Sequence, residues 1–129
     1  MPSQKRQFGD SGEKEAEKFL TAKGYKILDR SYRVKNIGEI DLIGEKQGKL
    51  FFFEVKTRDI KHETNFPIQF SIDVKKRTNL KRVCQIYLAA KSYPLDKKWQ
   101  VDGIFIKVDF LNGSHSIDHL ENILWEEYY

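Results

Sequence analysis

The chain has 129 residues, of which 40% are hydrophobic and 33% are charged, and its formal net charge is +4. This length fits a single domain over residues 1–129, and no apolar run approaches the roughly 20 residues of a membrane-spanning helix. Cys84 is the one cysteine, so no internal disulfide can form. The N-terminus is polar and lacks an apolar signal region, so we expect a cytoplasmic protein with no membrane partner.

The charge is distributed unevenly along the chain. All 23 Lys and Arg residues lie in residues 1–107, whereas five of the 19 acids lie in residues 109–129. Residues 1–108 therefore carry 23 minus 14, or +9. Phosphate attraction and counterion release make nucleic acid the expected partner of such a basic body, although basic domains also arise for solubility alone.

Residues 10–23 have the pattern of a first helix. Asp10 or Ser11 is the expected N-cap, and Glu13 follows Asp10 by three residues, as in a capping box. Helical periodicity places Glu13 on the side of the apolar stripe. Two interpretations of Glu13 stay open: a carboxylate that stabilises the helix N-terminus, and a third acid for a metal site.

Residues 25–34 predict a first strand, which leads into two apolar strands that contain charged residues, 38–43 and 50–56. The short polar connection between these two predicts an antiparallel hairpin. An unpaired carboxylate inside a buried strand costs several kcal/mol, so it needs a cation, a metal or a proton.

The period of two along a strand turns Glu39 and Asp41 to one face, and Glu54 and Lys56 also share a face. Folding the hairpin brings Asp41 near Glu54, about 5–8 Å apart at Cβ if the register puts both on one face. With the backbone carbonyl of Val55, these oxygens suit Mg²⁺. Lys56 would hold a metal-activated water or stabilise developing negative charge, which indicates phosphodiester hydrolysis. A lysine–carboxylate cluster that only satisfies itself is the structural alternative.

Downstream, residues 57–70 predict an irregular loop suited to substrate contacts, and residues 71–91 predict a second helix with Cys84 in its buried stripe. Residues 99–110 and 117–120 predict two more strands, the last at an edge. Lys76 lies on the stripe side of the second helix, toward the proposed site. The predicted phosphate-contacting residues, four of them on this helix, are Arg58, Lys75, Arg77, Lys81 and Arg82.

These residues and their surroundings resemble the bacterial YraN family, and the match covers nearly the whole chain. The family is similar to a Holliday-junction-resolvase-like branch of the restriction-endonuclease-like PD-(D/E)xK superfamily. The matching positions are Gly9, Gly12-Glu13, Gly24-Tyr25, Tyr32-Arg33, the 38–43 segment, the 53–56 segment with Arg58, Lys76, Tyr87-Leu88, Asp102, and His119 with Asn122.

The resemblance implies an α/β fold, a restriction-endonuclease-like sandwich in which helices flank a mixed sheet of four or five strands. It also implies roles for individual residues. Asp41 and Glu54 would be metal ligands, Lys56 the catalytic lysine, and Glu13 the helix acid found in junction-resolving relatives. Glu39 and Lys76 are family positions, which we treat as accessory residues of the site.

The chain departs from the family pattern outside the predicted metal ligands. Ile40 stands where the superfamily motif has proline, and Ser31 and Gln100 stand where the resemblance leads us to expect Asn and Arg. The region around Phe66 lacks the glycine that usually follows the catalytic strand, which changes the conformations open to the predicted substrate loop.

The leading hypothesis is a Mg²⁺-dependent endonuclease that hydrolyses DNA, with Mn²⁺ as an alternative metal and branched DNA as a candidate substrate. A branched substrate would suit a homodimer with two symmetric sites, by analogy alone. RNA stays open as a substrate. The rival hypothesis is a non-catalytic nucleic-acid-binding or partner-docking module that contains the charged cluster for structural reasons.

Overall fold

The computed structural model describes residues 4–60, 73–109 and 111–124, and residues 4–10 by their backbone only. Within these residues the elements are α1 (Gln4–Ala22), β1 (Lys26–Val34), β2 (Gly38–Lys46), β3 (Lys49–Asp59), α2 (Val74–Ala90), β4 (Trp99–Asp109) and β5 (Ser114–Leu120). The five strands form one sheet in the order β1-β2-β3-β4-β5. Strands β3 and β4 pair in parallel and all other neighbours pair antiparallel, so the predicted mixed α/β sheet is confirmed.

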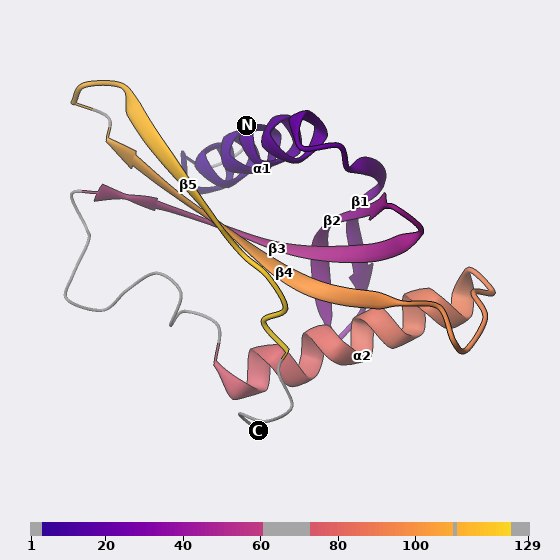
Figure 1. Cartoon of the computed structure of the whole chain (residues 1–129). Helices are drawn as coiled ribbons and strands as arrows, with labels where there is room; N and C mark the ends of the chain where they lie inside the picture. Colours follow the sequence, from indigo (N-terminus) through magenta and orange to yellow (C-terminus); the bar gives the residue numbers. More distant parts are fainter. Residues whose placement is uncertain (1–3, 61–72, 110, 125–129) are drawn as a thin grey trace.

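The two helices cover opposite faces of this sheet (Figure 1). Successive phenylalanines of β3 show the alternation: Phe53 packs with Leu20 of α1, whereas Phe52 packs with Leu80 and Tyr87 of α2. Cys84 lies in the α2 core and is a free thiol, as its place in the helical stripe predicted. No helix within the described ranges combines the length and apolarity needed to cross a membrane.

Several predicted boundaries were wrong: α2 begins at Val74, after its cap Asp73, rather than at residue 71, and β5 begins at Ser114 rather than at residue 117. Helix α1 begins at Gln4, so Asp10 and Ser11 lie inside the helix and are not its N-cap. The added residues are mainly Gln, Lys and Arg, which are good helix formers. Strand β3 extends to Asp59, into the predicted loop, because its parallel ladder with β4 continues that far. The predicted loop from position 61 to 70 lies outside the described residues.

A close approach between α1 and β3 brings Glu13 to the sheet. A Cβ added to Gly12 would lie 1.9 Å from Thr57 Oγ1, so the helix can approach this end of β3 only where it has no side chain. Glycine inside a helix costs about 1 kcal/mol relative to alanine. That cost is offset here because the close approach of the helix lets the neighbouring Glu13 reach Asp41 of strand β2.

A buried polar network ties the far end of the sheet to α1. Asp102 of β4 is 0% exposed, and its Oδ1 accepts hydrogen bonds from Gln100 Nε2 at 2.7 Å and from the Asn122 N–H at 2.9 Å. Its Oδ2 lies 2.8 Å from His119 Nε2, and Lys23 Nζ lies 3.0 Å from His119 Nδ1. Because an ammonium can only donate, Nδ1 accepts, and Nε2 carries the proton donated to Asp102.

Replacing Asp102 with Asn should destabilise the fold by about 2–4 kcal/mol. The amide would present N–H groups to Nε2, so His119 would have to move its proton to Nδ1, where it faces Lys23. Adding Lys23→Met should therefore recover part of the loss, although Lys23→Met alone costs little. Urea unfolding of the four proteins in this cycle measures the coupling, and strictly additive losses would contradict the assigned tautomer.

Gly12→Ala should destabilise the protein by about 1 kcal/mol, because overpacking against Thr57 exceeds the gain in helix propensity. In a Thr57→Ala background the closest clashing atom, Oγ1, is gone, so the same substitution should cost less or become stabilising. Thermal unfolding of the single and double variants tests this. An identical cost in both backgrounds would show that α1 does not depend on this contact.

Candidate metal centre

Strands β2 and β3 separate at Asp41. Their antiparallel pairing runs from the hairpin turn to Leu42 opposite Phe53 and ends there. One further step of the same register would place Asp41 opposite Glu54, as predicted. Asp41 Oδ2 instead accepts a hydrogen bond from the Val55 N–H at 2.8 Å. The carboxylate thus replaces a strand as the partner of this backbone group.

The backbone of β2 is irregular at the same point. Ile40 and Ile43 both pack on the α2 face, whereas Leu42 packs on the α1 face, so strict alternation fails around Asp41. On β1, Ser31 lies between the residues that pair with Ile40 and Leu42, and its φ is 51°. Asparagine tolerates this left-handed conformation better than serine, which is consistent with the Asn that the resemblance leads us to expect. This irregularity turns the Asp41 side chain toward the gap between the strands.

Asp41 lies among other negative charges. Burial is the largest cause that raises the pKa of Asp41, from 3.8 to about 7. The Val55 hydrogen bond opposes the rise, and the charges of Glu13 and Glu39 add to it. Glu13 also shares a hydrogen bond with Asp41, which two carboxyl groups can make only when one of them is protonated. The predicted inward direction of Glu13 is therefore confirmed.

Glu54 is a buried carboxyl group whose side chain is 5% exposed. Burial and the charge of Asp41 raise its pKa to about 7, and the charges of Lys76 and Lys56 act in the opposite direction. Lys76 Nζ lies 3.1 Å from Glu54 Oε1, so the residue leans toward the site as its position on the helix predicted. Glu54 and Lys56 lie two residues apart on β3 and share a face.

The Val55 carbonyl is placed to join these carboxylates. The N–H and C=O of one strand residue point to the same side of the strand. Because the Val55 N–H points to Asp41, its carbonyl also faces the gap between β2 and β3. Asp41, Glu54 and this carbonyl form the oxygen set that the sequence predicts for a hard divalent cation.

Asp41 and Glu54 do not form a three-ligand group with a third described His, Cys, Asp or Glu within 4.8 Å. Among the residues that the structure describes, one group of three has ligand atoms within 4.8 Å of one another, and it is Asp102, His119 and Glu121. Both oxygens of Asp102 are already hydrogen-bonded and Lys23 occupies His119 Nδ1, so we interpret that group as structural. Asp41 and Glu54 instead point to different partners, Glu13 and Lys76.

The accessory and basic residues are more dispersed than the pattern suggested. Glu39 is exposed near Asp41, and Arg58 follows Lys56 by two residues on β3. On α2, Lys75 and Arg82 are exposed on the side away from the sheet, whereas two others are half-buried at its flank, Arg77 and Lys81. The predicted phosphate-contacting residues of α2 therefore differ in exposure and occupy more than one side of the helix.

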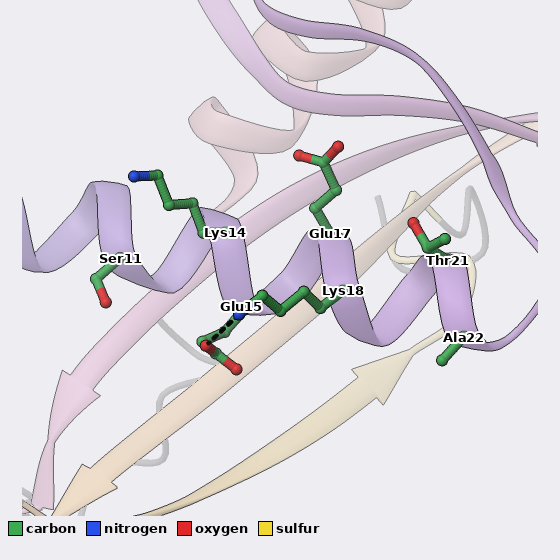
Figure 2. A pocket seen from close by; sticks show the side chains of 7 residues that line it. All are labelled: Ser11, Lys14, Glu15, Glu17, Lys18, Thr21 and Ala22. Atoms are coloured by element: carbon green, nitrogen blue, oxygen red, sulfur yellow. Dashed lines mark ion pairs between the residues drawn. The ribbon is translucent and has the colours of Figure 1, made fainter.

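Two surface hollows lie beside α1, and Asp41, Glu54 and Lys56 line neither of them. The larger is formed by one helix alone (Figure 2), where Lys18 and Glu15 make an ion pair at 3.7 Å. Its lining residues are Ser11, Lys14, Glu15, Glu17, Lys18, Thr21 and Ala22. Two lysines balance two glutamates there, so this hollow has no net attraction for an ion.

Comparison with known proteins gives matches over most of the chain. A UPF0102 protein of Roseiflexus castenholzii is 33% identical over 93% of this chain and 94% of its own length. One of Caldicellulosiruptor saccharolyticus is 39% identical over 92% of this chain and 97% of its own length.

Among solved structures, Pyrococcus furiosus SfsA in complex with Ca²⁺ aligns with 92% of this chain at 16% identity and a TM-score of 0.41. This chain spans 64% of the SfsA chain, and a likeness at that score does not establish a common fold. The model of the uncharacterised protein family UPF0102 matches residues 12–108, from the glycine beside Glu13 to strand β4. The match contains every predicted site residue, and the chain belongs to this family.

Proposed function

We propose that the protein is a divalent-metal-dependent endonuclease that hydrolyses phosphodiester bonds in DNA, with branched DNA as the candidate substrate. One observation carries the proposal. Two carboxyl groups with raised pKa values, Asp41 and Glu54, flank the point where a hairpin opens, and a backbone carbonyl faces the same gap. Perturbed acids gathered in this way mark candidate functional sites.

The residues present fit a hard cation such as Mg²⁺ or Mn²⁺. All the available donors are oxygens, and a divalent cation would offset both the burial and the repulsion that raise the pKa values of Asp41 and Glu54. When bound, the metal would polarise a phosphoryl oxygen and lower the pKa of a coordinated water. Asp41, Glu54 and the Val55 carbonyl would hold the metal.

Lys56 follows the metal ligands on β3, on the same face as Glu54. Its ammonium would lie beside the reacting phosphate, where it can orient the attacking water or stabilise the negative charge that develops. Glu13, whose carboxyl group hydrogen-bonds to Asp41, would lie at the edge of the site. Placement on strands and on a packed helix gives these groups fixed positions.

The rival proposal is a non-catalytic binding or docking module. The ion pair between Lys76 and Glu54 supports it, because this pair already neutralises one of the buried carboxylates. The pairing leaves Asp41 without a cation, however, since its described partners are an acid and a backbone N–H. That imbalance favours the metal site over a self-satisfied cluster.

Asp41→Asn should abolish turnover, with a loss on the order of 100-fold or more, because the amide is a poor ligand for Mg²⁺. Its oxygen can still accept from Val55, so the fold should persist. The assay uses labelled four-way junction, duplex, single-stranded DNA and RNA, each with Mg²⁺, Mn²⁺ or EDTA. Glu45→Gln, which removes an acid elsewhere on β2, is the matched control.

Cleavage that requires metal and survives in the control would support the nuclease and identify its preferred nucleic acid. DNA binding without cleavage under every condition would favour the binding module. Sedimentation with and without a junction tests the proposed homodimer separately, since the site itself does not require one.

Metal-free protein should become less stable as the pH rises from about 4 to about 7. Asp41 and Glu54 have ordinary pKa values of 3.8 and 4.5 but keep their protons to about pH 7 when folded. Between these limits the unfolded chain releases protons that the folded chain retains, so the free energy of unfolding falls, and it levels off above pH 7.

Asp41→Asn should reduce this fall and stabilise the metal-free protein at pH 8. Mg²⁺ at pH 8 should raise the melting temperature of the wild type but not that of the variant. Thermal melts at pH 5 and pH 8, with Mg²⁺ or EDTA, provide the comparison. Equal pH dependence in wild type and variant would show that the pKa of Asp41 is not raised in the folded protein.

A further inference from the structure

The two principal metal-ligand candidates are turned toward different helices. Asp41 makes its side-chain contacts with Glu13 of α1, whereas Glu54 makes an ion pair with Lys76 of α2. The two helices lie on opposite faces of the sheet (Figure 1). Within the described chain these carboxylates belong to no three-ligand group with atoms closer than 4.8 Å. A cation bound to Glu54 would therefore require the Lys76 ammonium or the Glu54 carboxylate to move.

Lys76 is well placed to control that movement. The backbone of its turn is anchored, because Asp73 caps α2 and accepts from the Lys76 N–H at 2.8 Å. The side chain is less constrained: 41% of it is exposed, against 5% for Glu54. A lysine with a fixed backbone and a long, partly solvated stem can move its ammonium over several ångströms without disturbing the helix.

The ammonium and a metal ion would compete for the same carboxylate. Lys76 Nζ lies 3.1 Å from Glu54 Oε1, within the distance at which a cation bound to that oxygen would repel it strongly. Glu54 is buried, so water cannot screen this repulsion well. Because 41% of the Lys76 side chain is exposed, a displaced ammonium can remain in contact with solvent, where a phosphate can also reach it.

We propose that Lys76 is an exchangeable counter-ion. It neutralises Glu54 in the metal-free protein, leaves that carboxylate when a divalent cation binds, and then contacts a phosphate of the bound nucleic acid. This inference rests on the proposed function and assigns Lys76 as a positioning residue that couples metal binding to substrate binding. A purely structural ion pair would show no such exchange.

The first test measures Mg²⁺ affinity by isothermal titration calorimetry at pH 8 for wild type, Lys76→Met and Lys75→Met. Methionine is a good helix former and keeps much of the lysine stem, so α2 should stay folded, which circular dichroism verifies. Lys76→Met should bind Mg²⁺ on the order of tenfold more tightly, because its competitor is gone. Lys75→Met removes the same charge from an exposed neighbour and should change Mg²⁺ affinity by less than about twofold.

Unchanged or weaker Mg²⁺ binding by Lys76→Met would overturn the exchange. If wild type binds Mg²⁺, Asp41→Asn does not, and Lys76→Met equals wild type, the metal site stands and only this inference fails. If wild type binds no Mg²⁺, both fall. Equal tightening by Lys75→Met and Lys76→Met would show a general charge effect and would also contradict the inference.

The second test follows Lys76 onto the nucleic acid. The dependence of four-way-junction affinity on salt is measured for wild type and Lys76→Met, in EDTA and in Ca²⁺, a hard cation that binds oxygen ligands. In EDTA the two proteins should have the same slope, since Lys76 is held by Glu54. In Ca²⁺ the wild-type slope should be steeper by about one phosphate contact. A slope difference that is the same in both conditions would contradict the transfer.

Discussion

The separation of β2 from β3 at Asp41 is the constraint on which the rest of the site depends. A ladder that continued would use the Val55 N–H and C=O in strand pairing and leave no open oxygen donors. The Asp41 carboxylate accepts from the N–H instead, which satisfies this part-buried donor where no strand pairs with it. The left-handed Ser31 and the failed alternation of β2 lie at the same level of the sheet. Local strain of this kind is tolerated where the surrounding structure holds it in place.

Two helices then determine what surrounds the opening. Gly12 lets α1 approach β3 closely enough for Glu13 to reach Asp41, and the Asp73 cap starts α2 where Lys76 can reach Glu54. One helix adds an acid and the other adds a cation. The first raises the pKa of Asp41 and the second opposes the rise for Glu54, so the metal-free site is electrostatically unbalanced. The uncompensated charges destabilise the metal-free folded state, and a bound cation would stabilise it.

The opposite end of the α1 face has the reverse character. Asp102 is as buried as any residue of the core, yet each of its oxygens has a donor and its charge is balanced through His119 by Lys23. A satisfied polar network specifies how β4, β5 and the segment around Asn122 meet the end of α1. This contrast distinguishes the two acid clusters. The cluster around Asp102 has all its hydrogen bonds and a balanced charge, which indicates a structural role, whereas the cluster around Asp41 has an uncompensated charge, which indicates a functional site.

The sequence by itself determined the order of elements, the hairpin, the two buried helix stripes and the identity of the charged residues inside apolar strands, because periodicity and turn composition are local properties. It also pointed to Asp41 and Glu54 as neighbours, but only on the condition of a suitable register, and that register comes from the β2–β3 pairing in the structure. Only the tertiary structure decided that Glu13 and Lys76 approach from opposite faces and that the basic residues of α2 spread around the helix. The left-handed Ser31 and the extension of β3 to Asp59 likewise depend on neighbouring strands. Such contacts join residues far apart in the chain, and local patterns do not encode which distant partner satisfies a buried charge.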